Sequence, residues 1–204
     1  MKARFFLRVL ALAVAAPGCS SCDLMLEGAI TSNLESRALA PGSRIDSKSF
    51  SVTVPHDTRL YLRHFDKKRE YLELADTDPV TLGYEYFVFP ADAASGESPG
   101  TALLRHYTTR NPRGNWEAMA TRPGGVKGSI GQVDIRSRRK EGGFVLSSEA
   151  FRDGTRIWMV SNLLYYPGPL IDGTPADVEE GAKLRAREAR KKATAFAKSF
   201  RLKR

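Results

Sequence analysis

The hydrophobic and polar positions along the middle of this chain alternate with a period of two, which is typical of β-strands. Residues 49–55 alternate phenylalanine and valine with serine and threonine and end at a proline, and residues 59–63 and 71–75 are shorter runs of the same kind. Residues 81–89 differ, because aromatic and β-branched side chains occupy both sides of the run. A strand that alternates has one buried face, whereas a strand that is apolar on both sides lies inside a sheet. We therefore expect the strand over residues 81–89 to be central.

Three longer runs with strand character follow one another after residue 130. They cover residues 130–139, 144–151 and 155–166 and are separated by Gly142-Gly143 and by Asp153-Gly154. Aspartate followed by glycine is a strong hairpin signal, because both central residues of a type I′ turn need a positive φ. These runs predict an antiparallel meander.

Between residues 91 and 131 the pattern is weaker. Residues 91–100 are rich in serine, glycine and proline, which predicts a loop. The leucines of residues 102–109 fit one helical face, but the tyrosine and two threonines at its end favour a strand, which is our prediction. Residues 111–131 contain five glycines and two prolines. Here we expect a long irregular insert in which Trp116 and Met119 anchor a short helix or turn.

The end of the chain has the pattern of an amphipathic helix with a defined start. Thr174 is a suitable N-cap, Pro175 suits the first helical position, and an aspartate follows in the first turn. From Val178 to Phe200, small apolar residues and two phenylalanines recur mostly at spacings of three and four, a stripe that packs closely on a sheet. Residues 199–202 have the character of an edge strand. The whole pattern predicts an α+β domain with a mainly antiparallel sheet and a C-terminal amphipathic helix packed on one face.

The first nineteen residues differ in composition from the rest. A basic start is followed by a short apolar stretch over residues 5–16, which is shorter than the roughly twenty apolar residues of a bilayer-spanning helix. This order predicts a secretory signal peptide over residues 1–18. The motif Ala16-Pro17-Gly18-Cys19 resembles the lipobox of bacterial lipoproteins, although Ala16 and Pro17 stand where leucine and alanine or serine are usual. The resemblance implies cleavage before Cys19 and a diacylglyceryl group on its sulfur.

The cysteines and the polar segment that follows them bound the domain organisation. Cys19 and Cys22 are the two cysteines of the chain, so no disulfide framework holds the body together. If Cys19 is acylated, Cys22 is a lone thiol and a candidate for a mixed disulfide or a second acyl group. A bridge between the two cysteines and an unreactive Cys22 both remain open as well. We expect a lipid-anchored flexible tether over residues 19–48 and a single α+β domain over residues 49–204. By analogy with diderm lipoproteins, Ser20 after the lipidated cysteine implies the outer membrane of a bacterial envelope, with the domain facing the periplasm.

Two short segments of the body resemble a known family. The opening Phe50-Ser51-Val52-Thr53-Val54-Pro55 strand and the closing helix, which runs into Ser199-Phe200-Arg201, resemble small exported proteins of the PsbP/DcrB type. The resemblance implies an α+β fold. It implies no catalytic residue, because a fold likeness does not establish a function.

The net charge of +9 is concentrated in one segment. Residues 179–204 hold ten basic and three acidic residues, a net charge of +7, whereas residues 19–178 hold 19 basic and 20 acidic residues. In an exported protein such a basic segment favours anionic lipid, polyanionic glycan or an acidic protein over nucleic acid. A helix face that is simply solvated is the plainer alternative.

The chain lacks several residue patterns that identify catalytic sites. No Gly-x-Ser-x-Gly motif is present, and His56, His64 and His106 are too scattered to pair on a metal ion. Residues 123–128 are rich in glycine with one lysine but lack the spacing of a phosphate-binding P-loop. Their backbone amides are candidates for an anion-binding nest. We expect no enzymatic activity, no metal and no cofactor.

The leading functional hypothesis is a lipid-anchored envelope protein whose non-catalytic domain binds a protein partner, in one version as an immunity protein against an envelope-targeted toxin. A first alternative is a module that binds anionic lipid or envelope glycan through the basic C-terminal helix. A second alternative is a hydrolase with a dispersed carboxylate site that uses residues such as Glu85 or Asp134. Exposed aromatic and arginine side chains dominate many interfaces. The candidate binding residues are Trp116, Tyr166, Arg187, Arg190, Lys191 and Lys192, and the candidate lipidation site is Cys19.

Overall fold

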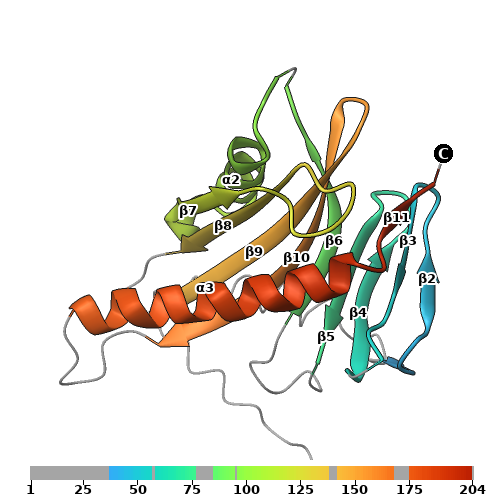
Figure 1. The fold of residues 1–204 in the computed structure, drawn as a ribbon, viewed down its shortest axis with the longest axis horizontal. Helices are drawn as coiled ribbons and strands as arrows, with labels where there is room; N and C mark the ends of the chain where they lie inside the picture. The colour runs from blue at the N-terminus through green and yellow to red at the C-terminus, as the bar shows by residue number, and fades with distance from the viewer. Residues whose placement is uncertain are drawn as a thin grey trace, which may run out of the picture.

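The chain adopts an α+β fold, the class that its sequence predicts (Figure 1). A computed structural model describes residues 37–56, 58–76, 85–94, 96–137, 142–167 and 175–203. In this part of the chain the elements follow in the order β1 (Arg37–Leu39), β2 (Arg44–Asp46), β3 (Phe50–Thr53), β4 (Leu60–Asp66), β5 (Tyr71–Ala75), β6 (Glu85–Asp92), α2 (Pro99–Arg110), η1 (Pro112–Gly114), β7 (Trp116–Arg122), β8 (Gly131–Ser137), β9 (Gly142–Asp153), β10 (Arg156–Pro167), α3 (Pro175–Ala197) and β11 (Arg201–Leu202).

The strands form a large and a small antiparallel sheet. The large sheet has eight strands in the order β1-β4-β5-β6-β10-β9-β8-β7. Strands β8, β9 and β10 are the predicted meander, and β6 lies inside the sheet between β5 and β10, as its apolar character on both sides predicts. The small sheet has the order β11-β3-β2 and joins the C-terminal end of the chain to two strands near residue 50.

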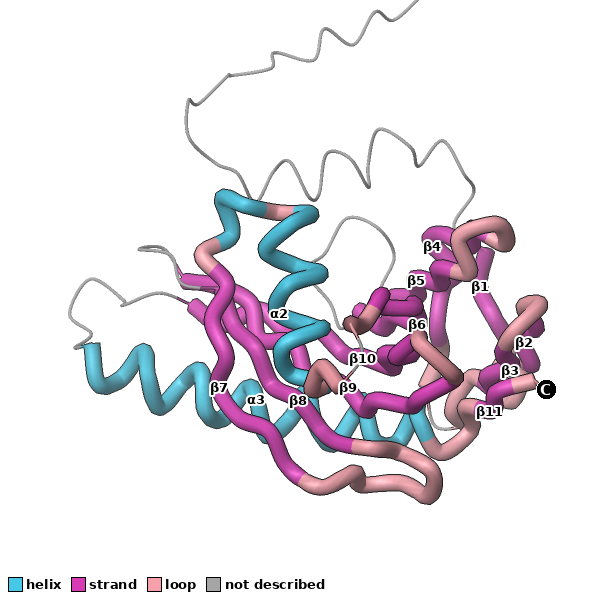
Figure 2. The backbone as a smooth tube through the Cα atoms, turned by 90° about the horizontal axis from the view of Figure 1, so that it is seen from above, coloured by secondary structure: helices cyan, strands magenta, loops and turns pink. Residues whose placement is uncertain are grey.

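Among the described residues, the α-helices α2 and α3 lie on opposite faces of the large sheet (Figure 2). Side chains of β10 alternate between them: Trp158 and Val160 share a core with Phe196 of α3, whereas Ile157 and Met159 share a core with buried residues of α2. Helix α3 crosses β8, β9 and β10, and α2 lies against β6, β7 and β8. We call the two sides of the sheet the α3 face and the α2 face. The small sheet packs into the core on the α3 face.

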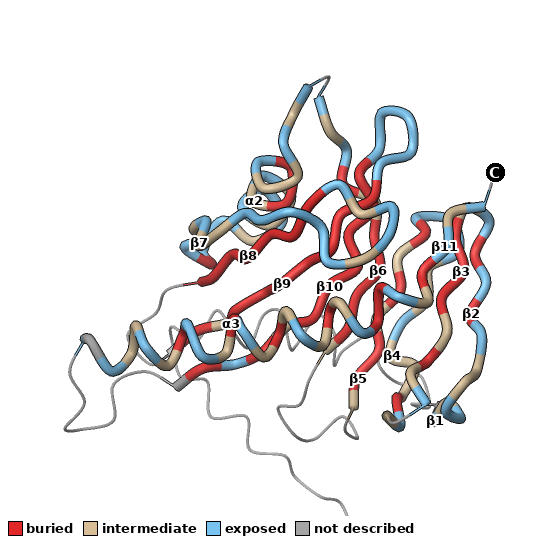
Figure 3. Tube along the Cα trace, viewed as in Figure 1, coloured by how far each residue is buried: buried red, intermediate tan, exposed pale blue. Residues whose placement is uncertain are grey.

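The apolar stripe of α3 packs on the sheet as the sequence predicts. The alanines at 182, 186, 189 and 193 are each at most 3% exposed, which allows the helix to lie close to the strands. Beyond them Phe196 packs edge-on against Tyr86 at a ring separation of 5.3 Å, and Phe200 stacks on Phe50 at 5.8 Å. Figure 3 shows the resulting band of buried strand residues beneath α3. Burial of each such aromatic ring contributes about 1.5–3 kcal/mol.

Residues 102–109 are part of helix α2, so the prediction of a strand there is wrong. The Oγ of Ser98 accepts a hydrogen bond of 3.2 Å from the backbone N–H of Thr101, and Pro99 takes the first helical position. Ala102 and Leu103 are fully buried against the α2 face of the sheet. The N-cap and this burial together outweigh the weak strand preference of the tyrosine and threonines at the end of the segment.

Residues 116–122 form the edge strand β7, where we expected an irregular insert with a short helix or turn. The strand pairs with β8 and has an irregular register between Ala118 and Ala120. The turn before it needs special residues: Asn115 has a φ of 46°, and a Cβ at Gly114 would collide with the indole of Trp116. The proline and glycines that suggested an insert therefore border a strand on both sides.

Two boundaries also differ from expectation. The β9–β10 hairpin pairs Asp153 with Arg156, so its loop residues are Gly154 and Thr155. Of these only Gly154 has a positive φ, 56°, which fits a type II′ turn rather than the type I′ turn that we expected. Residues 37–46, which we assigned to the tether, contain β1 and β2 and belong to the folded domain. Residues 1–36, including Cys19, lie outside the described residues.

Candidate binding site

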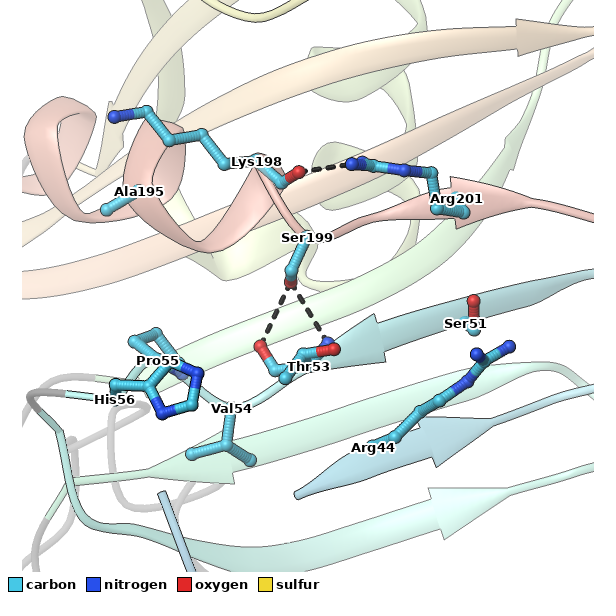
Figure 4. A pocket seen from close by; sticks show the side chains of 10 residues that line it. All are labelled: Arg44, Ser51, Thr53, Val54, Pro55, His56, Ala195, Lys198, Ser199 and Arg201. Atoms are coloured by element: carbon cyan, nitrogen blue, oxygen red, sulfur yellow. Dashed lines mark hydrogen bonds between the residues drawn. The ribbon is translucent and has the colours of Figure 1, made fainter. Parts of the chain in front are cut away.

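Two adjoining hollows lie along the C-terminal half of α3. The first, of about 510 Å³, opens between the end of α3 and the small sheet, and Figure 4 shows Arg44, His56, Lys198 and Arg201 around it. The second, of about 380 Å³, lies along α3 itself. Ala195 and Lys198 line both hollows, so the two hollows adjoin. We call the two hollows together the basic groove, after the six lysine and arginine side chains that line them, Arg44, Arg187, Arg190, Lys191, Lys198 and Arg201.

The spacing of α3 explains why these side chains gather. Arg187, Lys191 and Ala195 follow one another at intervals of four residues, which places them in one stripe of the helix surface, and Lys198 continues this stripe in the turn just after the end of α3. Arg187, Lys191 and Lys198 are exposed, while the alanine stripe on the other side of the helix is buried. The sheet that buries the alanines therefore leaves the basic stripe facing the groove.

The first hollow is held together by a contact between the end of α3 and β3. The backbone N–H of Thr53 donates to the Oγ of Ser199 at 3.0 Å, and the same hydroxyl lies 2.9 Å from the Thr53 carbonyl oxygen (Figure 4). Gly42, with a φ of 79°, packs so closely on the His56 imidazole that a Cβ there would lie 2.7 Å from Cε1. The Ser199 hydroxyl thus joins the two walls of the hollow, and close packing against Gly42 holds His56.

A buried carboxylate lies beside the second hollow. Asp134 of β8 is 1% exposed, and its Oδ2 is bonded to the guanidinium of Arg122 at 2.6 Å and to that of Arg190. The hydroxyl of Ser147 donates to its other oxygen. Burying a charge is costly unless it is paired and hydrogen-bonded, and here one carboxylate is shared by two guanidinium groups. The trio leaves an excess of one positive charge at the edge of the groove.

A second buried carboxylate, Glu149 of β9, lies under the floor of the groove. Its side chain is not exposed, and it accepts hydrogen bonds from the Gly125 N–H at 3.1 Å, the Ser129 hydroxyl at 2.7 Å and the Thr194 hydroxyl at 2.9 Å. The side-chain amide of Gln132 donates to it as well. All four donors are uncharged. This carboxylate connects the glycine-rich loop after β7 to β8 and to α3.

The same contacts bear on the anion-binding nest that we expected in residues 123–128. The one amide of this loop with a recorded side-chain acceptor, that of Gly125, points inward to Glu149. A Cβ at Gly125 would lie 2.6 Å from both Glu149 Oε1 and Gln132 Nε2, so the position has no room for a side chain. The loop therefore binds an anion that belongs to the protein itself.

The exposed cations of the groove have little internal compensation. Within the described part of the chain, no carboxylate pairs with Arg187, Lys191 or Lys198. Arg44 forms an exposed pair with Asp46 at 3.0 Å. Arg201 instead donates to the carbonyl oxygens of Lys198 and Phe200 at 2.7 Å each, which fixes its guanidinium without neutralising it. The groove is a cationic surface on an otherwise nearly neutral domain.

The strongly shifted carboxyl groups lie on the other side of the sheet. Burial, together with the nearby Glu73, raises the pKa of Glu85 to about 7, although Arg63 bonds it at 2.8 Å. Burial also raises the pKa of Glu73, which accepts a 3.2 Å hydrogen bond from Tyr71. Glu85 is paired across the strands with Leu163 on the α2 face, whereas Asp134 reaches α3. The two carboxylates of the hydrolase alternative therefore do not converge.

His106 does not take part in any such cluster. Its imidazole stacks on Phe89 at a ring separation of 4.6 Å, and burial lowers its pKa to about 4. The described residues contain no group of three or more histidine, cysteine, aspartate or glutamate side chains placed to hold a metal ion. Nor is any described helix long and apolar enough to cross a bilayer.

Some of the candidate binding residues predicted from the sequence line the groove, and others lie elsewhere in the fold. Arg187, Arg190 and Lys191 line the groove, while Lys192 does not. Trp116 is half-buried against Tyr107 at 4.8 Å on the α2 face. Tyr166 is 2% exposed, and its hydroxyl donates to the Ser137 carbonyl oxygen at 2.7 Å. Neither aromatic residue lines the groove.

Sequence reasoning missed the wall opposite α3. Arg44 and His56 belong to segments more than 130 residues before Lys198, and they reach it only because β3 pairs with β11. The one local signal is the edge-strand character of residues 199–202, which indicates pairing but names no partner. Gln132 was missed because it lies in β8 and meets Thr194 of α3 only in the folded domain.

No protein-family model matches the chain, and no curated protein matches it. Among solved structures, the fold is similar to a point mutant of a protein named Mog1, with a TM-score of 0.52 and 9% identity, over 83% of this chain and 96% of that one. It is also similar to the Ran-binding protein Mog1p of Saccharomyces cerevisiae, with a TM-score of 0.52 and 9% identity, over 82% of this chain and 96% of that one. At this identity the likeness shows a shared fold alone.

This comparison corrects the leading functional hypothesis from the sequence. Two solved structures that share the fold are of Mog1, one of them named as a Ran-binding protein, and neither is of a lipid-anchored immunity protein. The hypothesis of such an immunity protein was wrong. Its two alternatives, a lipid- or glycan-binding module and a carboxylate hydrolase, gain no support from these structures either.

Proposed function

We propose that this domain is a protein-binding module that receives an acidic segment of its partner in the basic groove. The observation that carries the proposal is the stripe of Arg187, Lys191 and Lys198, whose charges face a hollowed surface without a carboxylate partner among the described residues. An acidic segment supplies the missing counter-charges, and the depression gives it more contact than a flat surface does.

The choice of a protein as the partner has two supports. One solved structure that shares the fold is of a protein named for binding Ran and not for a reaction. The groove is bounded by a helix on one side and by strand β3 on the other, and its walls are held by hydrogen bonds such as the Thr53–Ser199 pair. A fixed groove between two elements fits an extended polypeptide segment better than it fits the surface of a lipid membrane.

The expected binding is of moderate strength and sensitive to salt. Each exposed charge pair contributes about 0.2–1 kcal/mol, so three of them contribute about 2 kcal/mol together. Salt at about 0.1 M screens exposed charges beyond roughly 10 Å, which weakens both the attraction and the rate of encounter. Tight binding therefore needs additional contacts from the partner.

A defined probe tests the proposal. Fluorescence anisotropy of a labelled glutamate-rich peptide is measured against the domain and against a triple variant with Arg187→Gln, Lys191→Gln and Lys198→Gln. We expect the triple variant to bind about thirtyfold more weakly, because it loses about 2 kcal/mol and each 1.4 kcal/mol corresponds to a factor of ten. A glutamine-rich peptide of the same length should show no binding to either protein.

The matched control removes three exposed charges elsewhere, with Lys67→Gln, Lys68→Gln and Arg110→Gln. These side chains are exposed and lie outside the groove. The control should bind the acidic peptide nearly as well as the natural protein does. Equal losses in both triple variants would mean that net charge matters and the groove does not. The partner itself can be captured by a photoreactive residue in place of Ala195, which lines both hollows.

The location of the protein is a separate proposal. We propose that the chain is exported and that Cys19 is acylated after removal of residues 1–18, on the strength of the lipobox-like motif alone. Mass spectrometry of the mature protein should find an acylated N-terminal Cys19. An intact Met1 on unacylated protein would contradict this, with no consequence for the groove.

A further inference from the structure

The second hollow concentrates positive charge on little more than one turn of α3. Arg187 is three residues from Arg190 and four from Lys191, so its side chain neighbours both of them on the helix surface. Like charges at these spacings repel and destabilise a helix. In the part of the chain that the structure describes, Arg187 and Lys191 have no carboxylate to relieve this repulsion. A bound anion relieves it.

Arg190 adds charge from the floor of the hollow. It is bonded to Asp134, but this carboxylate also serves Arg122 at 2.6 Å and accepts from Ser147. One negative charge is therefore divided between two guanidinium groups. The Nε of Arg190 is buried and has no hydrogen-bond partner among the described residues, which leaves a donor unused beside the hollow.

The neutral part of the floor is held in place from below. Gln132 and Thr194 line the hollow, and both donate to the buried Glu149, while Gln132 also donates to the Thr194 hydroxyl at 2.8 Å. The oxygens of Glu149 are occupied by these two donors and by Gly125 and Ser129. The floor is thus rigid before any ligand arrives, which lowers the entropic cost of binding.

We propose that the second hollow is an oxyanion subsite that receives a phosphoryl group on the acidic segment of the partner. This inference rests on the proposed function and names the chemical group that the groove prefers. A phosphoryl group carries about −1.5 to −2 charges and three acceptor oxygens, whereas a carboxylate carries one charge. Four cationic side chains, those of Arg187, Arg190, Lys191 and Lys198, line this hollow. Even with Arg190 paired to Asp134, their positive charge exceeds that of the phosphoryl group, and they offer more N–H donors than its three oxygens need.

The test compares one acidic peptide in three forms, with serine, glutamate or phosphoserine at its central position, by fluorescence anisotropy with the natural protein. We expect the phosphoserine form to bind about tenfold more tightly than the glutamate form, because hydrogen bonds between charged groups are the stronger ones. Inorganic phosphate should compete with the phosphoserine form more effectively than chloride does at the same ionic strength.

Two variants separate the subsite from general charge. Arg187→Gln with Lys191→Gln should bring the phosphoserine-to-glutamate ratio close to one. Lys183→Gln, an exposed position on α3 outside the hollow, should keep it near ten. Equal affinities of the natural protein for all three peptides overturn the subsite and leave the proposed function standing. No binding of any peptide overturns both, and binding to phosphatidylglycerol vesicles without a preference among the peptides overturns the subsite in favour of a lipid surface.

Discussion

Replacement of Glu149 by alanine removes the buried carboxylate that joins the glycine-rich loop, β8 and α3. Four uncharged donors, from Gly125, Ser129, Gln132 and Thr194, then lose their acceptor. A hydrogen bond to a charged group contributes about 1.5–3 kcal/mol, and a buried donor left without a partner costs about 1–3 kcal/mol. The opposing effect is release of a buried charge, whose desolvation costs several kcal/mol. With four donors for one charge, we expect a net loss of about 2–4 kcal/mol.

The assay is equilibrium unfolding in urea, read by the fluorescence of Trp158, which is fully buried in the core on the α3 face, and of Trp116. A Glu149→Gln variant keeps the shape and one acceptor oxygen but loses the charge, so its loss should be smaller, about 1–2 kcal/mol. The control Glu180→Gln removes an exposed carboxylate from α3 and should change stability by less than about 0.5 kcal/mol.

The reasoning fails if the alanine variant is as stable as the control. A variant more stable than the natural protein would show that the buried charge costs more than its hydrogen bonds return. Hydrogen exchange gives an independent reading, because the Gly125 amide should be protected in the natural protein and exchange freely in the alanine variant.

Three further predictions concern the stability of the fold on both faces of the large sheet, each measured by urea unfolding. Folding raises the pKa of Glu85 from 4.5 to about 7, so the folded state binds the Glu85 proton more tightly than the unfolded state does. The stability that this proton contributes is present below pH 4.5 and is lost as the pH rises through about 7, and Glu85→Gln should remove this dependence of stability on pH. Ser98→Ala should cost about 1 kcal/mol by removing the N-cap of α2, whereas Thr109→Ala at the exposed end of the same helix should cost less than about 0.5 kcal/mol. Gly125→Ala should destabilise the protein by about 1–3 kcal/mol, because the added Cβ meets Glu149 and Gln132. Gly181→Ala in α3, where a Cβ meets nothing within 4 Å, should stabilise it by about 0.5–1 kcal/mol, and equal effects at the two glycines would contradict the packing argument.

The sequence predicted those elements that are determined by residues close together in the chain. The alternation in residues 130–166 gave the meander, and Pro175 with the alanine stripe gave α3. The pattern failed at residues 102–109, where strand preference competes with a serine cap and with burial that only the folded sheet supplies. It failed again at β7, because glycines beside a strand look the same in sequence as glycines within a loop.

The candidate site was only half visible for a similar reason. The basic stripe of α3 can be read directly from the spacing of Arg187, Arg190 and Lys191. The opposite wall, with Arg44 and His56, depends on the pairing of β3 with β11 across some 150 residues, for which a single sequence holds no local signal. Tyr166 was misjudged because sequence does not reveal exposure, and its hydroxyl is used inside the protein by the Ser137 carbonyl.

The most direct test of the central claim, that the basic groove receives an acidic protein segment, is a titration of the isotope-labelled domain with a glutamate-rich peptide followed by NMR. We predict amide shift changes confined to the residues that line the groove, namely Arg44, Gln132 and residues 51–56 and 187–201, and a loss of these changes at high salt. Changes centred on the α2 face, around Tyr107 and Trp116, or an absence of changes at low salt, would contradict the account.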